Sequence, residues 1–186
     1  MTVRRLLALA VCAVAMAGCG NNKGSAVVEG DTEGIWIDVG ALDYHVQGSR
    51  QLNPAQVPDD RYLEGVPEDV AQPTGKETWF AVFLRIENKT DHTAPTADEF
   101  EIEDTEGDIY KPVALDAKVN PFAYTPQKLT PDAVMPHADS TQDFDSPAGS
   151  KLLFKLPLTS YQTRPLAVRI HAPAGSEEPA DAEVNL

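Results

Sequence analysis

The sequence predicts an all-β protein, an antiparallel β-sandwich with long Pro-rich loops. Apolar and polar residues alternate with a period of two along several short segments, which is the spacing of strands that bury one face. Prolines and glycines punctuate the connections, and no stretch has the period of an amphipathic helix. Short strands joined in this way are typical of two packed antiparallel sheets.

The first predicted strands include a central one. Residues 35–39 and 42–46 form a strand or strand pair that is broken at Gly40. Residues 79–87 form the strongest strand, because apolar side chains occur on both of its faces. One face carries Phe80, Val82, Leu84 and Ile86, and the other carries Trp79, Ala81, Phe83 and Arg85. We therefore place this strand in the middle of a sheet.

A hairpin and two more strands are expected further along the chain. Residues 100–103 alternate cleanly, residues 104–108 are rich in turn formers, and residues 109–113 return. Residues 151–157 and 165–171 are the last predicted strands. Their prolines stand at strand ends, where a missing N–H group does little harm.

Two long connections, residues 51–76 and 119–147, hold four and five prolines. Loops of this length in a compact domain are commonly functional. Their large side chains either staple the loops onto the sandwich or contact a partner, since aromatic anchors supply much of the binding energy of interfaces. Stapling is the more usual role of such side chains and partner contact is the other; for a loop surface that binds a partner, we predict these side chains as the contacts. The side chains concerned are Tyr62, Leu63, Phe122 and Tyr124.

Residues 1–19 resemble the signal of a bacterial lipoprotein. Two arginines at positions 4–5 precede an apolar run at residues 6–16, and two small residues precede Cys19. The run is shorter than the roughly 20 residues that span a bilayer. We expect cleavage before Cys19 and a lipid anchor on that cysteine at the extracytoplasmic face of the cell membrane. The alternatives are an ordinary signal peptide with an incidental cysteine, or an uncleaved anchor.

The rest of the chain divides into three predicted parts. We expect residues 20–34 to be a flexible tether, residues 35–172 the sandwich, and residues 173–186 a disordered acidic tail. Both cysteines, Cys12 and Cys19, lie in the signal, so the mature domain has no disulfide. Its stability must therefore come from packing.

The chain is strongly acidic, with 29 Asp and Glu against 15 Lys and Arg and a net charge of −14. Such a charge repels nucleic acid and anionic lipid surfaces, because binding to phosphates needs cationic side chains. We therefore expect no nucleic-acid partner. The charge either keeps the domain in solution or attracts a cationic partner or divalent ions.

Chemical motifs in the sequence are weak. The histidines have no local metal-ligand spacing, although distant ones can still converge in a sandwich. These are His45, His92, His137 and His171. Met135 lies beside His137 as in copper sites, but it is the one methionine after the signal. Residues 104–108 resemble part of a calcium loop without the bidentate Glu. We predict no metal site, no cofactor and no enzyme, because the usual catalytic motifs are absent.

Residues 82–90, 100–110 and 153–157 resemble the telokin-like, immunoglobulin-like lipoprotein domains of Gram-positive bacteria, many of unknown function. The resemblance extends over residues 39–170. It implies an immunoglobulin-like sandwich outside the membrane and brings no catalytic residues with it. The family's Pro-Gly turn is replaced by Pro131-Asp132, and the alanine-rich signal suits an actinobacterial source.

These patterns together predict a lipid-anchored binding or interaction module of the cell envelope, with an envelope protein as partner. The alternative is a solute- or metal-binding lipoprotein associated with a transporter, and a hydrolase with a triad assembled in space is a third. An exposed aromatic patch on the loops favours the first. A concave pocket with converging histidines and carboxylates favours the second, and a Ser–His hydrogen bond in a cleft favours the third.

Overall fold

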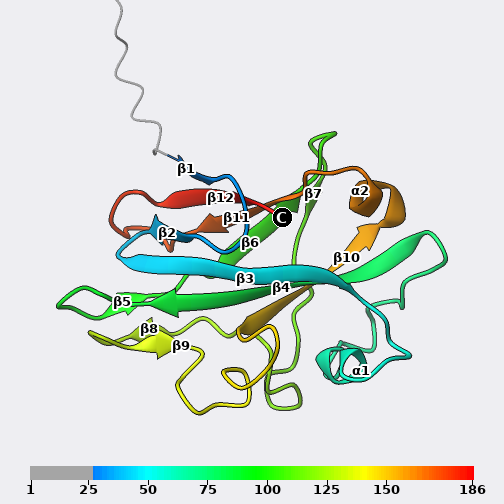
Figure 1. The fold of residues 1–186 in the computed structure, drawn as a ribbon, viewed down its shortest axis with the longest axis horizontal. Helices are drawn as coiled ribbons and strands as arrows, with labels where there is room; N and C mark the ends of the chain where they lie inside the picture. Colours follow the sequence, from blue (N-terminus) through cyan, green and yellow to red (C-terminus); the bar gives the residue numbers. More distant parts are fainter. Residues whose placement is uncertain (1–26) are drawn as a thin grey trace, which may run out of the picture.

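The computed structural model describes residues 27–186, and its body consists of two sheets (Figure 1). Sheet A contains, in spatial order, β1 (Val27–Gly30), β12 (Asp181–Asn185), β11 (Ala167–His171), β6 (Glu99–Glu103) and β7 (Ile109–Tyr110). Sheet B contains β10 (Ser150–Pro157), β4 (Glu77–Glu87), β3 (Leu42–Leu52) and β2 (Trp36–Val39), and β9 (Val134–Met135) also pairs with β4. A small sheet pairs β5 (Ala94–Pro95) with β8 (Lys128–Leu129). The predicted all-β sandwich is confirmed.

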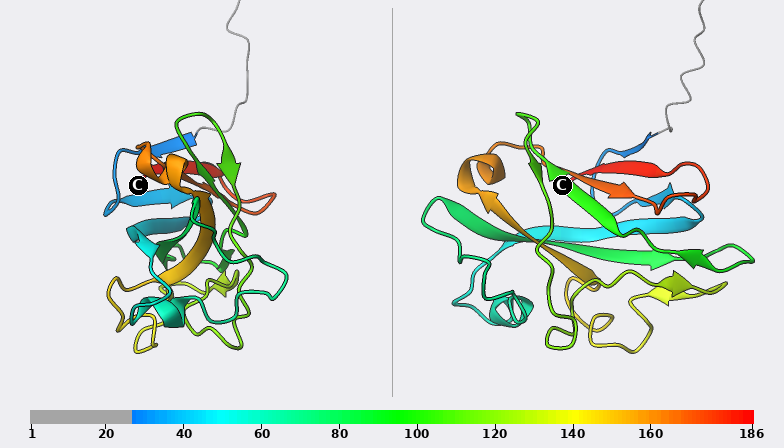
Figure 2. Two further views of the ribbon diagram at one scale, coloured as in Figure 1. Left: turned by 90° about the vertical axis from the view of Figure 1, so that its right-hand side faces the viewer. Right: turned by 180° about the vertical axis from the view of Figure 1, so that it is seen from behind.

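The molecule has three layers. Figure 1 shows sheet B in the middle, sheet A above it, and the long loops with helix α1 (Asp59–Tyr62) below it. The end-on view in Figure 2 likewise places α1 opposite to β1 and β12. A second short helix, α2 (Leu158–Gln162), continues from the end of β10. The sandwich therefore carries a third layer made of loops.

Strand β4 is buried on both faces, as the sequence predicts for a central strand. It pairs antiparallel with β3 on one side and with β10 on the other, where Leu84 lies opposite Val46 and Ser150. The even-numbered face of β4 packs into the core between the sheets, and the odd-numbered face packs under the loops. The register follows from the alternation of side chains along the strand.

The two ends of the predicted sandwich need correction. Part of the expected tether forms β1, which pairs in parallel with β12, and part of the expected disordered tail forms β12 itself. Ala182 and Val184 alternate with polar residues and are almost fully buried in the main core. The acidic and Pro-rich composition concealed this period of two, and pairing with β11 supplies the backbone partners that a short strand needs.

Within the described part of the chain, the buried members of the two clusters lie between Ile37 and Val184. Within this part of the chain, no helix is both long and apolar enough to cross a membrane. The predicted cleavage site and Cys19 lie outside the described residues.

Candidate functional site

A second buried cluster lies between the outer face of sheet B and the two Pro-rich loops. Its members come from the ends of β3, β4 and β10 and from both loops. They are Leu52, Tyr62, Trp79, Ala81, Phe83, Phe122 and Leu153. The loops therefore cover an apolar sheet face that would otherwise meet water.

Tyr62 and Phe122 are packing residues of this cluster. Tyr62 is 0% exposed, and its ring lies edge-on to Phe83 and Phe122 at centroid distances of 5.4 and 5.0 Å. Its hydroxyl donates a hydrogen bond to the carboxylate of Asp145, which belongs to the second loop. Edge-to-face pairs of this kind add to the energy of burial. Both side chains therefore staple the loops onto the sandwich.

Tyr124 and Leu63 are half-buried and also pack inward. The Tyr124 ring lies edge-on to Phe100 of sheet A at 5.0 Å, and its hydroxyl donates to the carbonyl oxygen of Ala97. Leu63 packs against the second cluster. None of the four predicted contact residues is thus an exposed anchor, because they supply the cover for apolar strand faces. The exposed aromatic side chain of these loops is Phe144, at 76% exposure.

Lys151 is a buried amine that the sequence analysis did not single out. It is 1% exposed, donates a hydrogen bond from Nζ to the carbonyl oxygen of Tyr62, and lies 5.1 Å from the centroid of that ring. Burial lowers the pKa of Lys151 from its ordinary value of 10.5 to about 7, against the opposing charges of Asp145 and Glu64. No local pattern marks this position, because its burial follows from the pairing of β10 with β4, where Lys151 lies opposite Phe83.

Asn120 ties the two loops together beside this amine. Its side-chain Nδ2 donates to the carbonyl oxygens of Tyr62 at 3.0 Å and Glu64 at 2.8 Å, and its Oδ1 accepts from the N–H of Phe122 at 2.9 Å. Buried loop carbonyls have no strand neighbour, so a side-chain amide must satisfy them. The loops are thereby fixed to each other as well as to the sheet.

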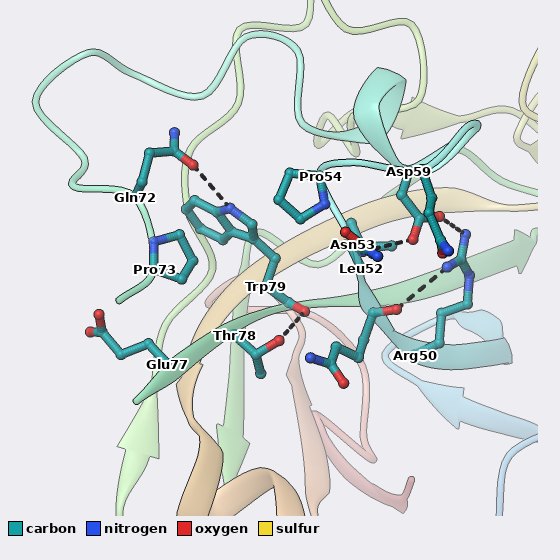
Figure 3. Close-up of a pocket in the computed structure, with 12 residues that line it drawn as sticks. Arg50, Leu52, Asn53, Pro54, Asp59, Gln72, Pro73, Glu77, Thr78 and Trp79 are labelled. Carbon is teal, nitrogen blue, oxygen red and sulfur yellow. Dashed lines mark hydrogen bonds and ion pairs between the residues drawn. The ribbon is translucent and has the colours of Figure 1, made fainter. Parts of the chain in front are cut away.

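An open groove lies at the edge of this loop-covered core, where β3 ends and β4 begins (Figure 3). Its volume is about 610 Å³. Its lining is mostly polar and includes several side-chain amides. The lining residues are Arg50, Gln51, Leu52, Asn53, Pro54, Gln56, Asp59, Gln72, Pro73, Glu77, Thr78 and Trp79.

One wall of the groove is fixed by an ion pair. Arg50 Nη2 lies 2.5 Å from Asp59 Oδ1, and Asp59 Oδ2 accepts the N–H of Asn53 at 2.8 Å (Figure 3). Burial alone would raise the pKa of the Asp59 carboxyl, but the hydrogen bonds from Arg50 and Asn53 hold that pKa below its ordinary value. The carboxylate therefore stays ionised and holds α1 against β3.

The opposite wall is fixed by Trp79, which is 1% exposed. Its indole Nε1 donates to Gln72 Oε1 at 3.3 Å, and this contact holds the end of the first loop over the ring (Figure 3). In contrast, the side-chain amides of Gln51 and Gln56 are exposed and make no hydrogen bond to the described part of the chain. The groove thus combines fixed walls with free donors and acceptors.

The other candidate motifs do not assemble into a site. His45 bonds to Gln47 on sheet B at 2.7 Å, whereas His171 bonds to Asp181 on sheet A at 2.6 Å. Met135 is buried in the main core and His137 is exposed. Among residues 27–186, no three or more His, Cys, Asp or Glu side chains come together as a metal would require.

The turn at residues 104–108 has a structural explanation. Asp104 is almost fully buried, and its Oδ1 accepts the N–H groups of Glu106 and Asp108, each at 3.0 Å. Its Oδ2 accepts the hydroxyl of Tyr110 at 3.0 Å. The carboxylate therefore closes the hairpin between β6 and β7 by the usual Asx geometry.

Comparisons with known proteins identify the fold but not the family. No protein-family model matches the sequence, and no curated protein sequence matches it. The solved structure of ycdA from Bacillus subtilis, provisionally described as a lipoprotein, has a TM-score of 0.52 and 6% identity over 84% of this chain. This chain spans 39% of the length of that protein.

Two further solved structures are similar over most of both chains. The yjhA protein of Bacillus subtilis has a TM-score of 0.48 and 9% identity, covering 84% of this chain and 98% of its own. An uncharacterized β-sandwich protein of Clostridium difficile 630 has a TM-score of 0.43 and 9% identity, covering 87% and 95%. At such identities the likeness concerns the sandwich fold alone. The telokin-like and actinobacterial parts of the resemblance stay predictions.

Proposed function

We propose that this protein is a lipid-anchored, extracytoplasmic lipoprotein that binds an envelope protein through its polar groove. The signal-like residues 1–19 support the anchor on Cys19, and the provisional description of the ycdA protein as a lipoprotein agrees with this class. The proposed task is binding rather than catalysis. Both carboxylates that line the groove are engaged, Asp59 by Arg50 and Glu77 by Thr74 and Lys155.

One observation carries the proposal: the groove has side-chain amides without partners in the described chain, between two walls that are held in place. The Gln51 and Gln56 side chains are exposed and unpaired within residues 27–186, while Arg50–Asp59 and Trp79–Gln72 hold the two sides in place. A surface that is ordered before binding loses little conformational entropy on binding. Amides both donate and accept, so they suit an uncharged polar segment with its own amides or hydroxyls.

The position of the groove is also consistent with a binding protein that is anchored near β1. Only residues 20–26 lie between Cys19 and β1, a stretch of at most about 25 Å when extended. The groove adjoins α1, which lies at the opposite end of the molecule from β1 (Figures 1 and 2). An anchor next to β1 would leave the groove directed away from the membrane.

A photocrosslinking experiment tests the proposal. A photoreactive phenylalanine analogue at position 56 should give one dominant adduct in intact membranes, and the same analogue at position 127 should not. Gln127 is a suitable control because it is exposed and its side chain is unpaired in the described chain. The adduct partner, once purified, should bind the Gln51→Ala, Gln56→Ala double variant about tenfold more weakly than wild type. Equal adducts from both positions, or unchanged affinity, would count against the groove.

A further inference from the structure

A second cavity lies where the two cores meet, and it shares no residue with the groove. Its volume is about 380 Å³, within the range of small-molecule sites. It opens between β6, the segment at residues 112–117 and the segment at residues 123–126. Its walls are mainly apolar and include Phe100, Val113, Leu115, Ala123, Tyr124 and Leu153.

One carboxylate stands at the opening of this cavity. Asp98 is exposed and makes no hydrogen bond or ion pair with the described residues. It also lines a shallower neighbouring cavity, with which the first shares Phe100 and Pro112. Asp98 is therefore a free negative charge beside an apolar space.

The other charges near this opening are already engaged. Lys111 Nζ lies 3.0 Å from Glu99 and 3.4 Å from Glu101, so both of these carboxylates already share a cation. The Lys151 amine donates to the carbonyl oxygen of Tyr62 in the second core. A ligand that enters the cavity thus meets mainly apolar walls, the Lys151 side chain whose amine is already engaged, and one unpaired carboxylate.

We propose that this cavity binds a small alkylammonium ligand. The apolar group lies among the half-buried side chains of Val113, Leu115 and Tyr124, and the protonated amine pairs with Asp98. Removal of the apolar group from water drives binding, and the ion pair selects cations over neutral and anionic analogues. The net charge of −14 favours the same choice, because it raises the local concentration of cations. This proposal is independent of the groove.

Titration with three probes of equal chain length tests the proposal. Isotope-labelled protein is titrated with hexylammonium, hexanol and hexanoate and followed by amide chemical shifts. Hexylammonium should bind best, with the largest shifts at Val113, Leu115 and Tyr124. In Asp98→Asn its affinity should fall about fivefold, to that of hexanol. Asp69→Asn is the matched control, since Asp69 is exposed and unpaired in the described chain and lies away from the cavity.

A second variant separates the cavity from non-specific attraction to an acidic protein. Ala114 is exposed at the opening, so Ala114→Trp should block the cavity without disturbing either core and should abolish the shifts for all probes. The proposal fails if wild type binds the three probes equally. It also fails if Asp98→Asn and Asp69→Asn weaken hexylammonium alike, or if the shifts centre on the groove near Trp79.

Discussion

The two faces of sheet B differ in how they are buried. The inner face packs against sheet A, and its side chains along β4 are apolar without exception from Phe80 to Ile86. The outer face packs against loops, and its core includes the amine of Lys151 and the amide of Asn120 beside aromatic rings. Both interiors are buried, yet among the described residues only the outer one contains a buried amine.

Backbone hydrogen bonding explains this difference. Paired strands satisfy their own N–H and C=O groups, so the interior between the sheets needs only apolar side chains. Loop backbones lack such neighbours when they are buried. The carbonyl oxygen of Tyr62 accepts from both Asn120 and Lys151, which do for a loop what an adjacent strand does in a sheet. A loop-covered core therefore needs polar side chains, and these make it sensitive to pH.

The largest expected effect is on the inner core. Leu84→Ala should lower the free energy of unfolding by about 2–5 kcal/mol, through lost transfer energy and the cavity that remains. Arg85→Ala, on the neighbouring position of β4, should cost less than about 1 kcal/mol because its ion pairs are long and half-exposed. Chemical denaturation of both variants checks the difference. Equal losses would contradict the assignment of faces on β4.

The loop-covered core should respond to truncation of its central ring. Tyr62→Ala should cost about 2–4 kcal/mol, because it removes two edge-to-face contacts and the hydrogen bond to Asp145. Phe144→Ala is the aromatic control from the second loop and should change stability by less than about 0.5 kcal/mol. Thermal unfolding measures both. An unchanged melting temperature in Tyr62→Ala would place that ring outside the core.

The inner core could be predicted from the sequence better than the outer core. The period of two along residues 79–87 gave the central strand and both of its faces, because a strand directs alternate side chains to opposite sides. The groove could not be predicted from the sequence. It lies between residues 50–59 and residues 72–79, and no local sequence pattern indicates that these segments come together. The sequence did not reveal Lys151 for a related reason, because its amine lies against Tyr62, which is distant in sequence.

A smaller loss is expected from the amide that joins the loops. Asn120→Ala should cost about 1–3 kcal/mol, because the buried N–H of Phe122 loses its acceptor. Limited proteolysis should then cut residues 51–76 or 119–147 sooner than in wild type, while the strands of the inner core stay protected. The control Gln127→Ala removes an unpaired amide and should behave as wild type. Uniform cleavage across the chain would argue against a separate outer core.

The lipid anchor should not affect the stability of either core. Cys19→Ser should leave the free energy of unfolding of the domain unchanged, since both clusters lie within residues 27–186. The same change should move the protein from the detergent phase to the aqueous phase, because a lipid chain contributes its own apolar surface. Wild-type protein that already partitions into water would contradict lipidation.

The buried amine gives the outer core its distinct pH dependence. The pKa of Lys151 is about 7 in the folded protein and 10.5 ordinarily, so between these values the unfolded chain binds one more proton than the folded one. Stability should therefore rise with pH across this window, by about 1 kcal/mol per pH unit. Burial also raises the pKa of Tyr62 and Tyr124, which lowers stability as pH rises, but only once unfolded tyrosines ionise near pH 10.

The most direct test compares wild type with Lys151→Met by urea denaturation at several pH values from about 6 to about 9.5, below the range of tyrosine ionisation. Met matches the apolar stem of Lys without the amine, and the Tyr62 carbonyl keeps the Asn120 amide as its donor. The wild-type free energy of unfolding should rise by about 1 kcal/mol per pH unit above pH 7 relative to the variant, and the variant should be at least as stable as wild type at pH 7. Parallel curves for the two proteins would contradict a buried amine that is neutral in the folded state.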